Sequence, residues 1–196
     1  MDMSQSNHPT EASDEAALLR RYAEGDPVAA RLLAGQMTPR VFGHAMRMLG
    51  NHAEAEDVTQ EAMMRLWRIA PDWREGDAKV STWLYRVTAN LCTDRLRKRG
   101  TMGLDEVAEP EDPQMSAEQN MQQTARVDAL QKALNTLPDR QRQAVVLRHI
   151  DGLANPEIAA ILEVGVEAVE SLTARGKRAL KQALEEKRDA LGFSDE

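Results

Sequence analysis

The segment from residue 101 to residue 125 divides the chain into two parts. It contains six acidic residues, two prolines and few apolar residues, and it has no lysine or arginine. Such a composition buries too little apolar surface to offset the entropy cost of folding, and it is typical of a linker. Six of the seven aromatic residues precede this segment, so the two parts need cores of different composition. We therefore predict two small units joined by a flexible acidic linker.

Helical periodicity runs through the first part. In residues 53–69, apolar residues recur every three or four positions, and Asn51 precedes them as a cap. Pro71 ends this helix, and residues 81–99 form another that stops at Gly100. Alternating strand-like runs are absent from the sequence, so the predicted fold class is all-α. The predicted buried stripe of the first helix comprises Ala55, Val58, Ala62, Leu66 and Ile69.

The second part also has a helical pattern. An amphipathic helix over residues 127–137 is followed by a helix that begins after Pro138 and stops near Gly152. Asn155 as N-cap and Pro156 at the first helical position then begin a short helix.

A turn at residues 164–166, relaxed by Gly165, joins this short helix to a longer one. Val169 and Leu172 begin the packed face of the longer helix, and the end of that helix is basic. This pair has the layout of a DNA-reading helix-turn-helix, in which cations bind phosphates and Arg175 is placed to reach a base edge. A helical hairpin with a solvated basic end is the alternative for this motif alone. The cations are Arg175, Lys177, Arg178 and Lys181.

A second basic stretch ends the helix over residues 81–99. Arg86 and Asn90 lie one turn apart and project from one face, while Trp83 and Tyr85 lie at the helix start. Cations, aromatic rings and an amide together suit single-stranded nucleic acid, because rings stack on bases and cations attract phosphates. For Trp83 itself we expect a place in the core. The basic residues that end this helix are Arg95, Arg97, Lys98 and Arg99.

The net charge of −7 does not exclude a nucleic-acid ligand, because the charges are unevenly distributed. Acidic residues concentrate in residues 1–26 and 101–125, whereas residues 27–100 carry twelve basic and eight acidic side chains. A local basic face, rather than the total charge, decides nucleic-acid binding.

A polar patch on the helix over residues 53–69 suits protein docking. Asp57, Gln60 and Glu61 form an exposed acidic group beside Met64 and Trp67. An ordinary solvated helix face explains the same pattern when the motif is taken alone.

Patterns typical of enzymes and of metal sites are absent from the sequence. The single Cys92 excludes an internal disulfide and a multi-cysteine zinc site, and no two histidines are four residues apart. We expect Cys92 to be a packing residue, and we expect no catalysis, no metal and no cofactor. Neither an 18-residue apolar run nor a signal-peptide pattern occurs, so we expect a cytoplasmic protein without membrane insertion.

Taken in order, these features resemble the sigma-70 family of bacterial RNA polymerase initiation factors, specifically its small extracytoplasmic-function (ECF) group. That group keeps only the second and fourth sigma domains, joined by a linker. The motif EDVTQEAMMRLWR is similar to the family's polymerase-docking helix, and STWLYRVTANLCTDRLRKR is similar to its −10 helix. The motifs LPDRQRQAVVLRHIDGLANPEIAAIL and VEAVESLTARGKRAL are similar to the domain that reads the −35 element.

The resemblance implies five segments along the chain. They are an acidic N-terminal segment (1–27), sigma region 2 (28–100), the acidic linker (101–125), sigma region 4 (126–186) and a C-terminal tail (187–196).

The resemblance further implies a promoter-specificity factor that binds core RNA polymerase, reads two promoter elements, helps open the DNA and is controlled by an anti-sigma factor. On the polymerase, the β′ clamp helices and the β flap would receive it, and the linker would run toward the RNA exit path. The loop over residues 72–79 would receive a flipped base.

The residues implied for polymerase binding are Asp57, Gln60 and Glu61. Those implied for the −10 element are Arg86, Asn90, Arg95, Arg97, Lys98 and Arg99. Those implied for the −35 element are Ala168, Ser171, Arg175, Lys177 and Arg178.

Two departures from the family pattern leave the −35 preference open. Glu163 stands where the family often has glycine, and Glu170 and Leu172 stand where basic residues are common. They motivate one alternative, a sigma-like decoy that occupies an anti-sigma factor without reading DNA. A dimeric helix-turn-helix repressor is a further alternative, but it explains neither the docking helix nor the linker.

Overall fold

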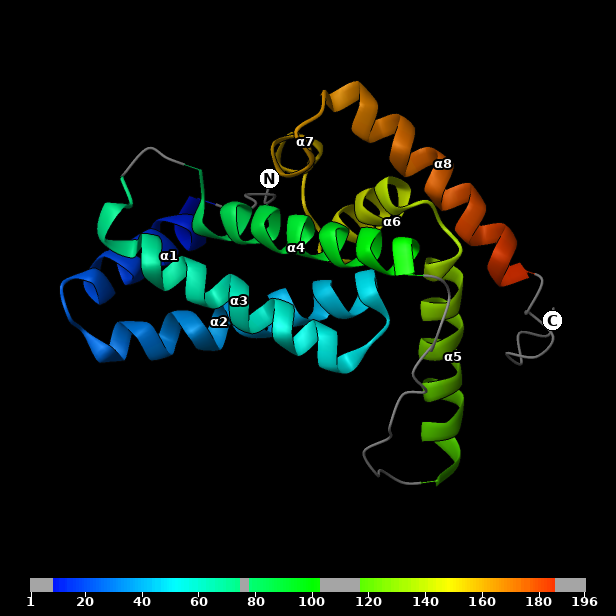
Figure 1. The fold of residues 1–196 in the computed structure, drawn as a ribbon, viewed down its shortest axis with the longest axis horizontal. Helices are drawn as coiled ribbons and strands as arrows, with labels where there is room; N and C mark the ends of the chain where they lie inside the picture. Colours follow the sequence, from blue (N-terminus) through cyan, green and yellow to red (C-terminus); the bar gives the residue numbers. More distant parts are fainter. Residues whose placement is uncertain (1–8, 75–77, 103–116, 186–196) are drawn as a thin grey trace, which may run out of the picture.

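A computed structural model describes residues 9–74, 78–102 and 117–185 of the chain. Over these residues the chain forms eight α-helices and no strand, which confirms the all-α prediction (Figure 1). A 3₁₀ turn, η1, and a π turn, η2, complete the regular structure. In chain order the elements are α1 (Pro9–Ala23), α2 (Pro27–Leu49), α3 (His52–Ile69), η1 (Ala70–Asp72), α4 (Val80–Met102), α5 (Ala117–Asn135), α6 (Asp139–Val145), η2 (Val146–Ile150), α7 (Asn155–Leu162) and α8 (Val166–Glu185).

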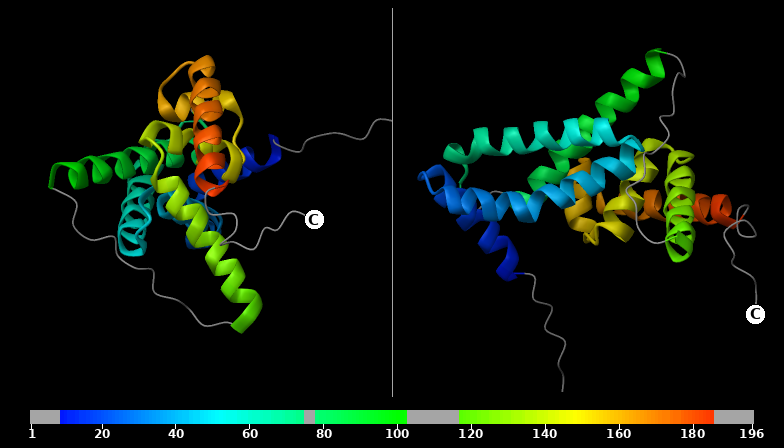
Figure 2. Two further views of the ribbon diagram at one scale, coloured as in Figure 1. Left: turned by 90° about the vertical axis from the view of Figure 1, so that its right-hand side faces the viewer. Right: turned by 90° about the horizontal axis from the view of Figure 1, so that it is seen from below.

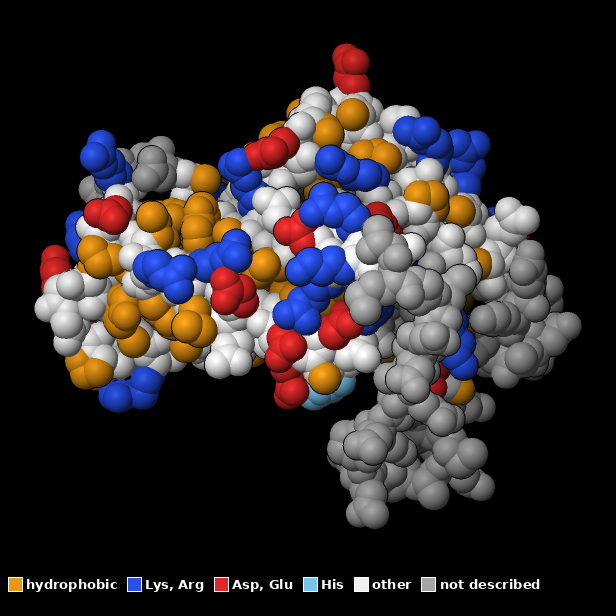
Figure 3. All heavy atoms as spheres, in the orientation of Figure 1, with side chains coloured by type: hydrophobic (Ala, Val, Ile, Leu, Met, Phe, Trp, Pro, Cys, Tyr) orange, Lys and Arg blue, Asp and Glu red, His pale blue; other side chains and the backbone are white. Residues whose placement is uncertain are grey.

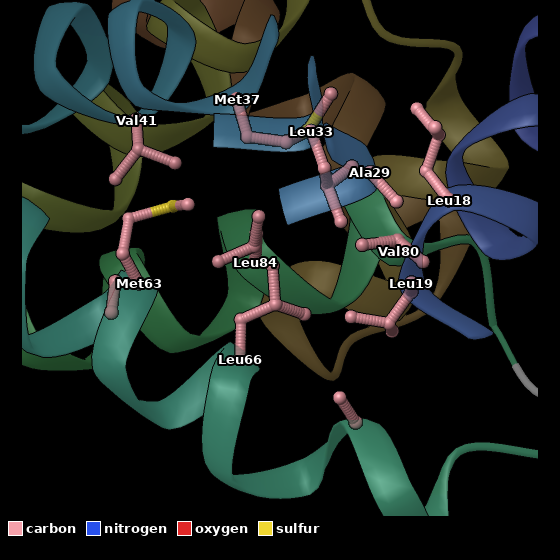
Figure 4. Packing of buried hydrophobic residues seen from close by; sticks show 12 residues of the cluster. Leu18, Leu19, Ala29, Leu33, Met37, Val41, Met63, Leu66, Val80 and Leu84 are labelled. Carbon is pink, nitrogen blue, oxygen red and sulfur yellow. The ribbon is translucent and has the colours of Figure 1, made fainter. Parts of the chain in front are cut away.

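Helices α1 to α4 form the first unit around a shared aliphatic core (Figure 4). Helix α1 lies within the acidic segment 1–27, yet its Leu18 and Leu19 are buried in this core, so the segment is part of the unit from residue 9 onward. Helices α2, α3 and α4 contribute side chains spaced three or four residues apart, which places them on one face of each helix. Residues contributed by α2, α3 and α4 are Ala29, Leu33, Met37, Val41, Ala62, Met63, Leu66, Val80 and Leu84.

Helix α3 begins and packs as its sequence predicts. The Asn51 side chain accepts a hydrogen bond from Glu54 N at 2.9 Å, which satisfies one amide of the first turn. Of the predicted buried stripe, Ala55, Val58, Ala62 and Leu66 are fully buried and Ile69 is half-buried.

Helix α4 differs from its prediction at both ends. It begins at Val80 and continues through Gly100 to Met102. Gly100 lacks the left-handed backbone of a glycine cap, so it does not end the helix. At the start, Ser81 N donates to Glu15 Oε2 of α1 at 3.0 Å. A buried carboxylate from another helix therefore satisfies the amino end of α4.

Helices α5 to α8 form the second unit. Pro138 precedes α6, and Gly152 has a left-handed backbone (φ 76°) after the π turn, which confirms the helix predicted between them. Helices α6 and α8 approach closely at Gly176. A Cβ atom there would lie 2.6 Å from Val145 Cγ2 and 3.0 Å from Gln141 O, so only glycine fits without movement.

One prediction about the helix-turn-helix is wrong in detail. The N-cap of α7 is Ala154 rather than Asn155. Glu157 in the first turn accepts from Ala154 N at 3.0 Å, so its carboxylate holds the start of α7 and the Asn155 side chain is not needed as a cap. In the turn after α7, Glu163 rather than Gly165 has the left-handed backbone (φ 55°).

Part of the predicted linker is helical. Helix α5 begins at Ala117, and its first half projects from the body of the protein (Figures 1 and 2). Its second half packs on the first unit, where Gln131 Nε2 donates to Arg47 O at 3.1 Å. Residues 103–116 of the linker lie outside the described residues.

The two units pack against each other, and one apolar cluster spans both. Tyr85 and Ala89 of α4 are buried together with Leu147, Ile158 and other residues of the second unit. The sequence predicts two separate cores because the aromatic residues are unevenly distributed, but periodicity alone does not reveal that one face of α4 is covered by the second unit. The cluster also includes Ala144, Ala159, Ile161, Leu162 and Val169.

Candidate nucleic-acid interface

One face of α4 carries the residues predicted to read the −10 element. Arg86 and Asn90 are both exposed and lie one turn apart. Arg97 follows Arg86 by eleven residues, or about three turns, and therefore lies on the same side of the helix. Lys98 is also exposed, about a third of a turn away.

Two of the predicted −10 residues face α3 instead. Arg95 Nη1 lies 3.4 Å from Asp57 Oδ2 of α3, and Arg99 Nη2 lies 2.6 Å from Glu54 Oε2. Arg99 Nη1 also donates to Leu49 O at 3.0 Å. Because these arginines are about half a turn away from Arg86 on α4, the predicted set divides into an outward face and a brace against α3.

The aromatic residues before and within α4 pack on the core of the first unit. Trp73 and Trp83 contact each other edge to face, with ring centroids 6.0 Å apart, and both are half-buried on that core. This confirms the core position expected for Trp83. The loop predicted to receive a flipped base includes residues 75–77, which lie outside the described residues.

The predicted docking patch lies on the outer face of α3. Asp57 and Gln60 are exposed, and Glu61 is half-buried and paired with Arg65 at 2.8 Å. The neighbouring Met64 is 48% exposed. Apolar side chains gather on this side of the molecule over α3 and the start of α4 (Figure 3).

The predicted reading face of α8 is open to solvent. Val169 and Gly176, seven residues apart, are buried against the second unit, so the opposite side of the helix faces outward. Arg175 Nε donates to Ser171 O at 3.2 Å, which holds the guanidinium along its own helix. Basic side chains gather over this helix (Figure 3). All five residues predicted for the −35 element are exposed: Ala168, Ser171, Arg175, Lys177 and Arg178.

Two further basic residues lie beside this face. Arg148 and His149 of the π turn are exposed. Partial burial lowers the pKa of His149 below its usual value, and the positive charges of Lys177 and Arg148 lower it further. The sequence shows Arg148 and His149 as neighbours but gives no sign that Lys177, 28 residues later, lies close to them.

Cations at and just before the start of α4 are paired with acidic residues of α7 and of its C-cap. Arg86 forms an ion pair with Glu163, and Lys79 Nζ lies 2.8 Å from Glu157 Oε1. Farther along α4, Gln143 Nε2 of α6 donates to Thr93 Oγ1 at 2.8 Å. The predicted −10 face is therefore partly occupied by the second unit.

Two buried polar links join α2 to the second unit, and no local sequence pattern indicates either of them. Arg142 is buried and donates to Met48 O at 2.5 Å, to Asn135 O at 3.2 Å and to Leu137 O at 3.3 Å. Its burial lowers the pKa of the guanidinium from the usual value. The fully buried His44 contacts Asp151, with Nδ1 2.8 Å from Oδ2.

Neither a reactive thiol nor a metal site is found among the residues that the structure describes. Cys92 is fully buried, and this burial raises the pKa of its thiol to about 12, which confirms that it is a packing residue. No group of three His, Cys, Asp or Glu side chains there could hold a metal ion. None of the described helices is long and apolar enough to cross a membrane.

Comparison with known families matches both units. Residues 33–101 match the model of sigma-70 region 2, and residues 128–180 match the model of sigma-70 region 4. These ranges contain the docking patch, the α4 face and the α8 face.

Individual relatives agree with this match. The chain is 37% identical over 156 residues to the ECF RNA polymerase sigma factor SigE of Mycolicibacterium smegmatis. This match covers 78% of the chain but only 60% of SigE. It is 33% identical over 184 residues to the ECF RNA polymerase sigma factor SigW of Bacillus subtilis, covering 85% of the chain and 94% of SigW. The fold is similar to that of the sigma factor RpoE from Bartonella quintana, whose structure was solved in complex with the anti-sigma factor NepR. The TM-score is 0.66 and the sequence identity is 22%, and the match covers 79% of this chain and 96% of the RpoE chain. The chain belongs to the ECF group of the sigma-70 family of RNA polymerase sigma factors.

Proposed function

We propose that this sigma factor docks on core RNA polymerase through α3, reads the −10 element with α4 and reads the −35 element with α8. The observation that carries the proposal is the placement of three different surfaces on three helices of one chain. They are an acidic and apolar patch on α3, a face of cations with an amide on α4, and a basic face on α8. Binding, rather than catalysis, is the activity that these surfaces support.

On α4, Asn90 is the base reader and the cations supply attraction to phosphates. An exposed amide one turn from Arg86 can hydrogen-bond a base edge, whereas Arg86, Arg97 and Lys98 attract the backbone. Arg95 and Arg99 have a different role, because their ion pairs with α3 fix the reading helix to the docking helix.

On α8, Arg175 is the base reader, and Lys177 and Arg178 attract phosphates. Ala168 and Ser171 share the exposed face with Arg175 and leave room for close approach to the groove. The Glu170 side chain accepts from Asn155 Nδ2 at 3.5 Å, which directs it toward α7.

The partners follow from these surfaces. Asp57, Gln60 and Glu61 would meet the β′ clamp helices, the second unit would meet the β flap, and the acidic linker would run toward the RNA exit path. We also propose control by an anti-sigma factor, a kind of partner that the RpoE structure contains. The sigma factor would act in the cytoplasm, where the polymerase is.

The docking surface is tested by reversing one charge. Asp57→Arg places a cation where the polymerase is expected to meet an acid, and its affinity for core polymerase should fall by roughly 2 kcal/mol. Glu56→Arg makes the same charge change on the preceding residue of α3 and should have little effect. Fluorescence anisotropy measures binding, and circular dichroism checks that both variants stay helical. Equal affinities for the two variants would refute docking through Asp57.

Promoter reading is tested by transcription from a promoter library with core polymerase. Asn90→Ala should relax the preference at one −10 position, by about 1–3 kcal/mol of discrimination. Arg175→Ala should change which −35 sequences work. A uniform loss at all positions would mean that these residues only support their helices. If the native chain served no promoter but bound an anti-sigma factor tightly, it would be a decoy.

A further inference from the structure

Glu170 is an exposed acidic residue on the helix proposed to read the −35 element. It follows the buried Val169 by one residue, and this rotation of about 100° places it on the flank of α8 rather than on the packed face. It lies in the second turn of α8, and the amino-terminal residues of a recognition helix are the ones that contact base edges. In the proposed DNA complex, Glu170 therefore lies at the major groove.

The stability of α8 does not explain this acid. Glu167 lies in the first turn, where a carboxylate stabilises the positive end of the helix dipole, but Glu170 lies beyond that turn. The residues one turn away from Glu170 carry no positive charge, so no ion pair of that spacing compensates its charge. These neighbours are Val166, Glu167, Thr173 and Ala174. A role in recognition, rather than in folding, is left for this side chain.

Asn155 at the start of α7 holds the Glu170 carboxylate. Its Nδ2 donates to Glu170 Oε1 across 3.5 Å, and helices α7 and α8 pack against each other (Figure 1). Among the described residues no donor contacts the second oxygen, Oε2, which is therefore available to a ligand. An acceptor that is already held in one direction loses less conformational entropy when it binds.

The base that suits a fixed carboxylate oxygen is cytosine. In the major groove the cytosine N4 amino group donates, whereas guanine N7 and O6 and thymine O4 only accept. Adenine also donates through N6, but its N7 acceptor lies beside that amino group and would repel the carboxylate. A negatively charged acceptor thus gains a hydrogen bond at cytosine and meets a repelling acceptor at each of the other three bases.

We propose that Glu170 is a second base reader on α8, which accepts a hydrogen bond from the N4 amino group of a cytosine in the −35 element, and that Asn155 is its positioning residue. This proposal rests on the proposed binding of α8 to the −35 element. It gives a role to a glutamate that stands where basic residues are common in the family. Around the helix axis the exposed Ser171 lies between Glu170 and Arg175, so the two sides of the reading face carry an acceptor that suits cytosine and a donor that suits guanine.

The test uses holoenzyme assembled from core polymerase and the full-length chain. Its probes are duplex promoters in which the −35 positions of the most active library promoter are randomised, and sequencing of the bound fraction gives the preference at each position. We expect one position at which the native chain prefers cytosine, on either strand, by about tenfold over the other bases.

Glu170→Ala should remove the cytosine preference and leave the preferences at the other positions unchanged. Because alanine does not repel phosphates, the affinity for unrelated DNA should rise about twofold. Circular dichroism checks that this variant and those below stay helical. Lower discrimination combined with higher non-specific affinity distinguishes a base reader from an acid that only repels DNA, since removal of the latter would raise the affinity for all sequences alike.

A second probe deletes only the group that Glu170 is proposed to contact. Replacing the preferred cytosine by 2-pyrimidinone removes the N4 amino group, and it should weaken binding of the native chain about fivefold more than binding of Glu170→Ala. The effect of the lost amino group on the duplex itself is common to both proteins and cancels in the comparison. Anisotropy titrations with the two duplexes measure the difference.

Asn155→Ala tests the positioning role. It should reduce the cytosine preference about threefold at the same position and change no other position. Combined with Glu170→Ala, it should have no further effect on that preference, because the carboxylate that it positions is gone. A merely structural role of Asn155 would instead weaken binding to all sequences alike.

Glu185→Gln is the matched control, because it removes the same charge from an exposed position at the end of α8, about 22 Å along the helix from Glu170. It should leave every −35 preference unchanged. The proposal is overturned if Glu170→Ala changes the affinity for all sequences equally, or if 2-pyrimidinone weakens binding of both proteins alike. Failure of the proposed function has a different signature, in which Arg175→Ala as well as Glu170→Ala leaves every −35 preference intact.

Discussion

The two helices proposed to read DNA differ in what covers them. The reading face of α8 is open, and its cations Arg175, Lys177 and Arg178 point to solvent. The face of α4 is partly covered by the second unit, and its Arg86 is already paired with a carboxylate. In the free protein the proposed −35 surface is therefore open, whereas the second unit contacts part of the proposed −10 surface.

The contact between the two units is more polar than the core inside the first unit. That core is made of aliphatic side chains, with Leu33 and Leu66 fully buried, whereas the contact between the units includes ion pairs and hydrogen bonds to backbone oxygens. Polar groups regain hydrogen bonds with water when they separate. A polar interface is therefore suited to units that part and rejoin, while an apolar core is suited to units that stay folded.

The largest expected effect comes from the buried cation at this contact. Arg142→Met removes the donor from Met48 O, Asn135 O and Leu137 O, and it should lower the free energy of unfolding by about 3 kcal/mol. The methionine keeps most of the length, so the loss reports the hydrogen bonds rather than a cavity. Urea denaturation followed by circular dichroism measures it.

Lys132→Met provides the control for Arg142→Met. It also replaces a cation by methionine, but Lys132 is exposed on α5, and the change should stay within about 0.5 kcal/mol. If both variants unfold at the same urea concentration as the native chain, Arg142 does not hold the units together.

Local patterns in the sequence predict the helices of this protein well. The Asn51 cap, the buried stripe of α3 and the packed position of Val169 all follow from rules that reach only three or four residues along the chain. The sequence predicts Asn155 as the α7 cap, whereas the structure has Ala154 there, because side-chain type alone does not show at which residue the helix begins. The sequence indicates a turn relaxed by Gly165, but it does not show that Glu163 is the residue with the left-handed backbone.

Contacts over long sequence distances could not be predicted in the same way. Arg86 and Glu163 are 77 residues apart, and His44 and Asp151 are 107 apart. The predicted −10 set included Arg95 and Arg99 for the same reason: their charge suggested DNA, and only the packing of α3 on α4 shows that they pair with acidic residues of α3.

A smaller effect is expected for the second buried link. His44 and Asp151 are in contact at 2.8 Å with almost no solvent exposure, and Arg47 lies 3.9 Å from the same carboxylate. A double-mutant cycle with His44→Ala and Asp151→Ala should give a coupling of about 1–2 kcal/mol in urea denaturation. A coupling near zero would mean that the apolar cluster alone holds α4 covered.

The smallest expected effect sharpens the description of α8 as an open basic face. The pKa of His149 is lowered by partial burial, then by the charges of Lys177 and Arg148. A DNA phosphate bound at Lys177 would offset that repulsion and raise the pKa of His149, so DNA binding would take up a proton. Affinity for a −35 duplex should therefore rise as the pH falls from about 7.5 to about 5.5. A pKa rise of about half a unit corresponds to a gain in affinity of about threefold.

His149→Gln should abolish this pH dependence. His52 is an exposed histidine in the first unit, and His52→Gln should leave the pH dependence unchanged. Anisotropy titrations at constant salt measure it, and a His149→Gln variant with the native pH profile would show that no phosphate lies near Lys177.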